Sequence, residues 1–212
     1  MSGTILLTGF DKFGPYDRNP AAEIAEALDG QTIGGYSIRG IRLPINFRTF
    51  REELHDHLTE INPSIALGLG MDFKDVPHLS VEMEARPIAR YGTFQDEEGS
   101  SAGTVTLDSN PAVLIIPNRE QLEHAIQAMS PYFIASTNAG GHMCETVLRD
   151  LITLSEGGKQ FLPGFVHVPH LEEQLEQSAA LDPHVHSMPF DEQLRRVQQY
   201  LEVVIAMCEA SE

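Results

Sequence analysis

In the first 70 residues, segments with the hydrophobic pattern of a β-strand alternate with segments that have the pattern of an amphipathic helix. Continuous or alternating apolar runs predict strands, and apolar residues at helical spacing predict amphipathic helices between them. Asn19-Pro20 is typical of a helix start, because an N-cap residue is followed by proline at the first helical position, and Gly30 is typical of the helix end. The expected elements are strands over 4–10, 36–44 and 63–70, and helices over 20–29 and 47–61.

The remainder of the chain continues the alternation of strands and helices. We expect extended chain over 78–91, a polar loop or hairpin over 95–111, helices over 119–129, 144–158 and 189–212, and strands over 131–137 and 160–170. Strands that alternate with helices favour a parallel sheet. No repeat or linker divides the sequence. We therefore predict one α/β domain over residues 1–212, an open, twisted, mostly parallel sheet with helices on both faces.

Composition and charge narrow the classes of function. A chain of 212 residues, 42% of them hydrophobic, suits one domain with a sizeable core. A formal net charge of -17 argues against nucleic acid and anionic membranes as partners, because both are polyanions. The first residues do not resemble a signal peptide, and no run approaches the roughly 18 apolar residues of a membrane span. A cytoplasmic location is the expectation.

Cys144 is the first candidate for chemistry. It is one of two cysteines, and it follows Gly140 and Gly141 at the expected start of a helix. The partial positive charge and unpaired N–H groups of a helix start favour a thiolate, and glycines let the backbone approach a ligand closely. Cys208, in the last predicted helix, is expected to be a packed or partly exposed thiol. The two cysteines are not expected to form a disulfide.

A nucleophilic cysteine needs a base within hydrogen-bond reach and a third group that orients the base. His167, near the end of the strand over 160–170, is the nearest candidate base, and Glu82 in the extended segment could orient it. If the strand over 131–137, which precedes Cys144, and the strand over 160–170, which contains His167, are neighbours, both side chains could open onto one edge of the sheet. A lone cysteine is also often a small buried hydrophobic residue, so spacing alone leaves both interpretations open.

Five segments, in order across nearly the whole chain, decide between these interpretations by resemblance. They are LLTGFDKFGPYDRNPA, SVEMEA, STNAGGHMCETVL, GFVHVPHLEEQ and SMPFDEQLRRV. They resemble the pyroglutamyl peptidase I family, also called pyrrolidone carboxyl peptidases, which are cysteine peptidases with a single-domain α/β fold.

The resemblance assigns a role to each matching position. It implies that Cys144 is the nucleophile, His167 the base and acid, and Glu82 the third member of a catalytic triad. The lactam ring of the substrate would lie against Phe10 and Phe13, with Asn19 as a polar pocket residue. His142, where the family has an aromatic residue, and Met143 would also contact the substrate.

The resemblance also implies the reaction and the partners. The reaction is hydrolysis of peptides with an N-terminal pyroglutamyl residue through a thioester, without metal or cofactor. The protein would be a homo-oligomer, either a tetramer or a dimer.

Other functions remain as alternatives. A relative with a changed acyl or lactam substrate, or an inactive binder of a small ligand, would share the fold. A phosphorylase-like enzyme would need a cationic phosphate site, and the strand-end loops offer little beyond Lys12 and Arg18. Metal binding by His55 and His57 is disfavoured because positions i and i+2 of a helix face apart. His184 and His186 lack a third ligand and are expected to lie in a solvated loop.

Overall fold

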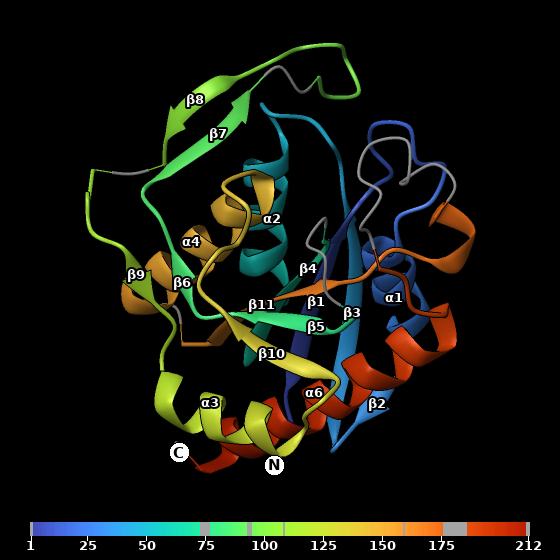
Figure 1. The fold of residues 1–212 in the computed structure, drawn as a ribbon. Coiled ribbons are helices and arrows are strands. Elements are labelled where there is room, and N and C mark those ends of the chain that lie inside the picture. The colour runs from blue at the N-terminus through green and yellow to red at the C-terminus, as the bar shows by residue number, and fades with distance from the viewer. Residues whose placement is uncertain are drawn as a thin grey trace.

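The centre of the computed structural model is the strand β1 (Thr4–Phe10), which pairs in parallel with β3 (Tyr36–Leu43) and β4 (Ile65–Met71) (Figure 1). The crossover helices α1 (Pro20–Leu28) and α2 (Phe50–Ile61) connect these strands, as the sequence predicts. The structure describes residues 2–72, 77–92, 95–107, 109–158, 160–175 and 186–210. Among these, no helix is long and apolar enough to span a bilayer.

The sheet grows from this parallel centre toward both edges. Its strand order is β10-β5-β11-β4-β1-β3-β2. The added strands are β2 (Thr32–Ile33), β5 (Leu79–Glu82), β10 (Phe133–Ser136) and β11 (Leu162–Val168). β11 is parallel to β4, whereas β5 is antiparallel to β11, β10 is parallel to β5, and β2 is antiparallel to β3. The prediction of a mostly parallel sheet is therefore confirmed, with a reversed pair, β5 and β10, at one edge and the short reversed strand β2 at the other.

The reversal of β5 has a simple cause. A parallel return normally needs a crossover of about a dozen residues or more, usually with a helix. The connection between β4 and β5 is residues 72–78, which is too short for such a crossover. The chain therefore enters β5 in the opposite direction, and β10 then follows the direction of β5.

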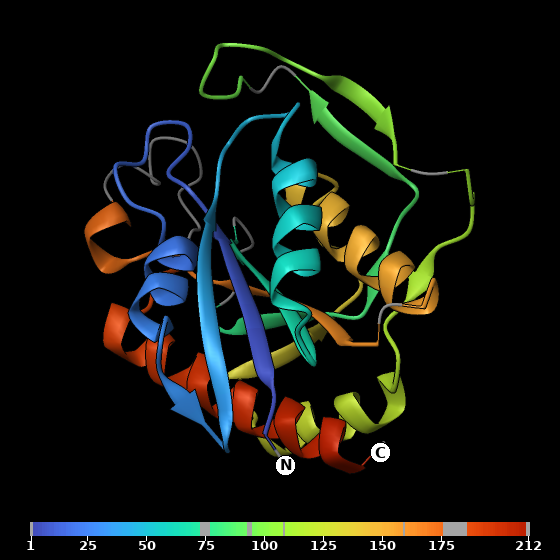
Figure 2. The same ribbon diagram turned by 180° about the vertical axis from the view of Figure 1, so that it is seen from behind.

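Helices cover both faces of the sheet, and each face has its own apolar core. On one face, α1 packs with α3 (Arg119–Ala128) and α6 (Phe190–Ala210) over residues such as Leu67 and Val166. On the other, α2 and α4 (Met143–Glu156) pack over residues such as Leu6 and Phe165 (Figure 2). Full burial of each such side chain contributes about 1.5–3 kcal/mol, so the two cores hold the strand ends in fixed positions.

A hairpin arm extends from the α2–α4 face. β7 (Ile88–Gly92) pairs antiparallel with β8 (Gly103–Thr106), so the polar segment predicted as a loop or hairpin is a hairpin. The short strands β6 (Glu84–Ala85) and β9 (Leu114–Ile115) pair at its base. Tyr91 of β7 stacks on Phe47 with ring centroids 4.7 Å apart. Phe47 lies outside α2, which begins later than the periodicity predicts. A 3-10 helix, η1 (Glu172–Gln174), follows β11.

Candidate active site

A cavity of about 470 Å³ lies where β1, β4 and β11 end and α4 begins. Parallel strands bring their carboxyl ends to one edge of a sheet, which is the usual place for a site in such folds. The cavity is lined by seven of the residues singled out in the sequence: Phe10, Phe13, Asn19, His142, Met143, Cys144 and His167. Glu82 does not line the cavity and lies buried behind His167.

Cys144 occupies the first turn of α4 and is partly exposed. The first hydrogen bond of the helix runs from the Thr146 N–H to the His142 carbonyl (3.2 Å). The N–H groups that precede Thr146, including that of Cys144, are those a helix leaves without internal partners. The turn before the helix requires glycine, because Gly140 and Gly141 have φ values of 84° and 69°.

His167 and Glu82 form a buried pair across neighbouring strands. Ser80 of β5 lies directly opposite His167 of β11, and Glu82, two residues further on, projects on the same face. Glu82 Oε1 lies 2.8 Å from His167 Nδ1. Both side chains are buried, with 0% and 4% of their surface exposed. The Glu82 carboxylate therefore fixes the orientation of the imidazole and favours the tautomer with its proton on Nδ1.

The Cys144 thiol interacts with the other edge of the imidazole. Burial alone would lower the pKa of His167, but the charge and hydrogen bonding of Cys144, and then those of Glu82, raise it to about 10. Because Glu82 occupies Nδ1, the hydrogen bond with Cys144 falls to Nε2. Cys144, His167 and Glu82 thus form a continuous thiol–imidazole–carboxylate chain, with the thiol at the cavity wall.

Gly70 provides the space in which thiol and imidazole meet. It lies opposite His167 in the β4–β11 register. A Cβ atom at this position would lie 2.9 Å from both Cys144 Sγ and His167 Cδ2. Any side chain here would therefore displace one or both groups. The role of Gly70 could not be predicted from the sequence, because a glycine inside a buried strand gives no sign of what lies against it.

The turn before Cys144 is held by Glu145, a fully buried carboxylate. Its Oε1 accepts a hydrogen bond from the Arg86 backbone N–H (2.6 Å), and its Oε2 accepts from Arg86 Nε (3.0 Å) and the Gly141 N–H (3.2 Å). Arg86 also donates to the Asn138 side chain. Hydrogen bonds to charged groups contribute about 1.5–3 kcal/mol each, so this network fixes the start of α4. The role of Glu145 was likewise not predicted from the sequence.

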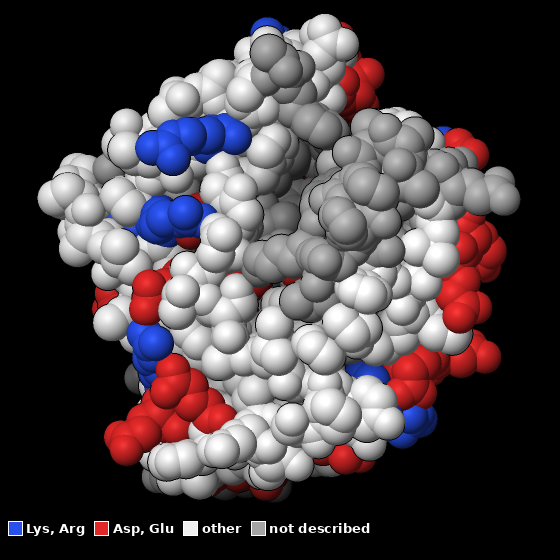
Figure 3. Space-filling model, viewed as in Figure 1, with Lys and Arg blue, Asp and Glu red and all other residues white. Residues whose placement is uncertain are grey.

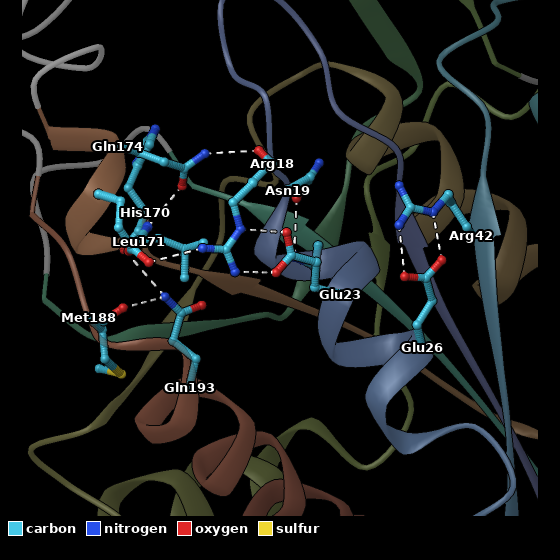
Figure 4. A network of polar contacts seen from close by, with 12 residues as sticks. Arg18, Asn19, Glu23, Glu26, Arg42, His170, Leu171, Gln174, Met188 and Gln193 are labelled. Carbon is cyan, nitrogen blue, oxygen red and sulfur yellow. Dashed lines mark hydrogen bonds and ion pairs between the residues drawn. The ribbon is translucent and has the colours of Figure 1, made fainter.

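The opposite wall of the cavity is the loop between β1 and α1. Asn19 Oδ1 accepts from the Ala21 N–H (3.1 Å), and Asn19 Nδ2 donates to the Asp11 carbonyl (3.0 Å). Asn19 therefore caps α1, as predicted, while it also lines the cavity. In Figure 4, Arg18 forms a bidentate ion pair with Glu23, and the Gln174 side chain donates to the Arg18 carbonyl (2.8 Å). The loop is thus attached both to its own helix and to the segment after β11.

Aromatic side chains at the cavity also pack against rings of the core and of the arm. Phe10 is 5% exposed and packs edge-on against Phe50, whereas Phe13 is less buried and lies beside Tyr16. His142 contacts the Tyr91 ring edge-on (centroids 5.1 Å apart), and its Nε2 lies 3.3 Å from the Tyr91 carbonyl. Burial lowers the pKa of His142, although the Tyr91 carbonyl opposes the shift. The His142 side chain is therefore mostly neutral at pH 7.

Cys144 and His167 reach the same cavity by a different route from the one considered in the sequence. The strands that precede Cys144 and contain His167 are not neighbours, because β5 lies between β10 and β11. β10 also runs against β11, so its end does not lead directly to the cavity edge. Residues 137–142 return the chain to that edge and place the start of α4 there. The inserted strand is the one that contains Glu82.

Comparison with known proteins gives the family. A family model described as pyroglutamyl peptidase matches residues 3–207. The chain belongs to the pyroglutamyl peptidase family. Pyrrolidone-carboxylate peptidase from Bacillus cereus (strain G9842) is 29% identical over 174 residues, 81% of this chain and 80% of that protein. The Pyrococcus furiosus protein of the same name is 28% identical over 207 residues, 95% of this chain and 97% of the other.

A crystal structure shows the same fold. The structure of pyrrolidone carboxyl peptidase from the hyperthermophile Pyrococcus furiosus superposes with a TM-score of 0.86 at 25% sequence identity. The match covers 97% of this chain and 99% of that chain. This similarity extends through the whole α/β architecture, so the site of this pyroglutamyl peptidase family member lies in a fold that the family shares.

Other candidate groups lie outside this cavity. Within the described ranges, no three His, Cys, Asp or Glu side chains are placed to hold a metal ion. His184, one half of the pair considered as metal ligands, lies outside the described residues. Cys208 of α6 is partly buried, packs against the core, and its Sγ lies 3.9 Å from the Ser64 carbonyl. In this pyroglutamyl peptidase family member, Cys144 is therefore the cysteine at the cavity.

Proposed function

We propose that this protein hydrolyses the bond after an N-terminal pyroglutamyl residue of peptides, with Cys144 as nucleophile, His167 as acid and base, and Glu82 as the group that orients His167. The observation that supports this most is the buried Glu82–His167 pair beside the partly exposed Cys144 thiol. Membership of the pyroglutamyl peptidase family supports the choice of substrate.

The proposed reaction is acyl transfer through a thioester. In the reactive state, His167, whose raised pKa favours the imidazolium form, pairs with a thiolate on Cys144. The thiolate attacks the carbonyl carbon that joins the pyroglutamyl group to the next residue, not the carbonyl of the lactam ring. The oxyanion that forms accepts a hydrogen bond from the Cys144 N–H at the start of α4. His167 then gives its proton to the departing amine. In the second half, His167 removes a proton from water, and the resulting hydroxide attacks the thioester and releases pyroglutamate and the thiolate.

The shape and polarity of the cavity suit a lactam. A pyroglutamyl group has no N-terminal charge, so it can enter an apolar cavity without the cost of burying an ammonium group. Phe10, Phe13, Ile45 and Met71 form apolar wall there. Small-ligand sites commonly combine such walls with a few polar groups. A free N-terminal amine would lose its hydration in the same place, which is the proposed basis of selectivity.

The test is hydrolysis of a fluorogenic pyroglutamyl amide by wild type, Cys144→Ala and Cys208→Ala. Loss of the nucleophile is expected to lower kcat/KM by at least about 10³-fold, whereas Cys208→Ala, a matched removal of the other thiol, is expected to retain activity. Circular dichroism shows whether each variant is folded. Full activity in folded Cys144→Ala would refute the mechanism. Absence of turnover by the wild type would refute the proposed substrate. Homo-oligomerisation stays a prediction, which light scattering tests.

A further inference from the structure

A second cavity, of about 450 Å³, adjoins the first on the side of the hairpin arm. One wall is formed by β7, with Ile88 and Arg90, and by Arg86, which precedes that strand. The other wall is the turn before Cys144. Asn138 and Gly140 line both cavities, so the two share a wall at this turn. The turn thus lies between the two cavities, and a molecule bound at Cys144 would have to pass over it to reach the second cavity.

The second cavity has a positive charge that the fold leaves unbalanced. The charge of Arg86 is offset by the buried Glu145, 2.9 Å away. Arg90 is exposed and has no ion-pair partner in the part of the chain that the structure describes. In a chain of net charge -17, this is an unusual position for a cation. Figure 3 shows basic side chains over the β7 side of the face drawn, beside a hollow.

We propose that the second cavity binds the part of the peptide that follows the pyroglutamyl residue, and that Arg90 there binds a carboxylate. The inference rests on the proposed function, because it needs the acyl group in the first cavity. The carboxylate belongs either to an acidic side chain in the first two residues after the cleaved bond or to the free C-terminus of a very short peptide. Guanidinium groups recognise both in the same way.

The distances permit this assignment. The Arg90 backbone N–H donates to the Gly141 carbonyl (2.6 Å), and Gly141 is three residues before Cys144. Three residues span at most about 10–11 Å, and an extended peptide advances about 3.3 Å per residue. Two residues beyond the cleaved bond, with a side chain, therefore cover the distance from the Cys144 backbone to the Arg90 backbone. Arg90 points out of β7 because its neighbours Ala89 and Tyr91 are the buried positions.

The experiment compares matched substrate pairs that differ by one carboxylate. One pair is pyroglutamyl-alanyl-glutamate amide and pyroglutamyl-alanyl-glutamine amide, and the other is pyroglutamyl-alanyl-alanine with a free or an amidated C-terminus. For each pair, kcat/KM of the peptide with the carboxylate is divided by kcat/KM of the neutral peptide. This ratio is measured in wild type and in Arg90→Gln. The ratio is expected to fall about two- to five-fold in Arg90→Gln, as for an exposed ion pair. It is expected to be retained in Arg90→Lys and to fall further in Arg90→Glu. The pair that responds identifies the source of the carboxylate.

The control is Arg39→Gln, which removes the same charge from β3, away from both cavities. It is expected to leave both ratios unchanged. If the ratios fall equally in Arg39→Gln, the effect comes from the net charge of the protein and the proposal is overturned. Unchanged ratios in Arg90→Gln would also overturn it.

Calorimetric binding of the two glutamyl and glutaminyl peptides to Cys144→Ala, with and without Arg90→Gln, gives a reading that does not depend on turnover. If wild type hydrolyses none of the peptides, the proposed function fails. The binding ratio still decides the role of Arg90: a two- to five-fold fall supports it, and no change overturns it.

Discussion

Replacement of Gly70 by alanine tests the arrangement of the site most directly, because it adds one methyl group at the point where the thiol and imidazole meet. The new Cβ would lie 2.9 Å from Cys144 Sγ, 2.9 Å from His167 Cδ2 and 3.0 Å from Phe165 Cε1. Nonbonded heavy atoms rest about 3.5–4.0 Å apart, so at least one group must move by about 0.5–1 Å. The imidazole is held by Glu82, so the thiol is the more movable partner.

A misplacement of about 1 Å in a reacting group can lower the rate by about 10²-fold, which corresponds to about 2.7 kcal/mol of transition-state stabilisation. We therefore expect Gly70→Ala to lower kcat/KM for a pyroglutamyl amide by about 10²-fold. Its overpacking is expected to reduce the free energy of unfolding by about 1–3 kcal/mol. For a protein of this size, each kcal/mol lowers Tm by about 2–4 °C.

The matched control is Gly164→Ala in the neighbouring strand β11. A Cβ at Gly164 would lie 2.7 Å from Leu67 Cδ1, so it also overpacks the sheet, but it touches neither the thiol nor the imidazole. Both variants are expected to lose thermal stability, and only Gly70→Ala is expected to lose most of its activity. A folded Gly70→Ala enzyme with kcat/KM within three-fold of wild type, a limit of roughly 0.7 kcal/mol, would show that the close approach at Gly70 does not position the nucleophile.

Three further changes test other parts of the structure. In Glu82→Gln the carboxylate that helps to raise the pKa of His167 is lost, so the alkaline limb of the kcat/KM profile is expected to move to lower pH; an unmoved limb would contradict the assignment of that limb to His167. Burial lowers the pKa of His170 to about 4 in the folded protein. As pH falls, His170 is therefore protonated in the unfolded chain before it is protonated in the folded protein. Stability is therefore expected to fall as pH decreases from about 6.5 to 4, by up to about 1.4 kcal/mol per pH unit, and urea titrations of His170→Asn should show a smaller slope. Tyr91→Phe removes the 2.7 Å hydrogen bond to Thr146 between the arm and α4, which is expected to cost about 1 kcal/mol and to lower Tm by about 2–4 °C; an unchanged Tm would mean that this bond adds nothing.

Features with local causes could be predicted from the sequence. β1 begins and ends where its apolar run predicts, and α1 begins at Pro20 after the Asn19 cap. In both, the decisive contacts are between residues close in sequence. Cys144 at a helix start follows from the same kind of signal, a glycine turn before an amphipathic repeat. The expected strand ends made His167 and Glu82 candidates to act with Cys144, and the family resemblance then selected this combination, since no local pattern links positions so far apart.

Features with distant causes could not be predicted in this way. The place of β5 between β10 and β11 depends on which strands it joins, and its fully buried sequence LSVE does not identify those partners. Phe47, which the periodicity assigned to α2, lies before the helix and stacks on Tyr91, a residue of the arm. Gly70 and Glu145 matter because of what packs against them in three dimensions. Each of these is decided by a contact between segments far apart in the chain.

The reversed strand β5 also determines which part of the site can adjust. Glu82 and His167 both belong to strands inside the sheet, and each is anchored by backbone pairing on neighbouring strands. Cys144, by contrast, follows a two-glycine turn that is attached to neighbouring segments by the half-exposed Arg86 and by one backbone hydrogen bond, from the Arg90 N–H to the Gly141 carbonyl, rather than by strand pairing. Any rearrangement on arrival of a peptide is therefore expected to move the sulfur toward a stationary imidazole, so ligand-dependent changes in amide exchange should concentrate in residues 138–145.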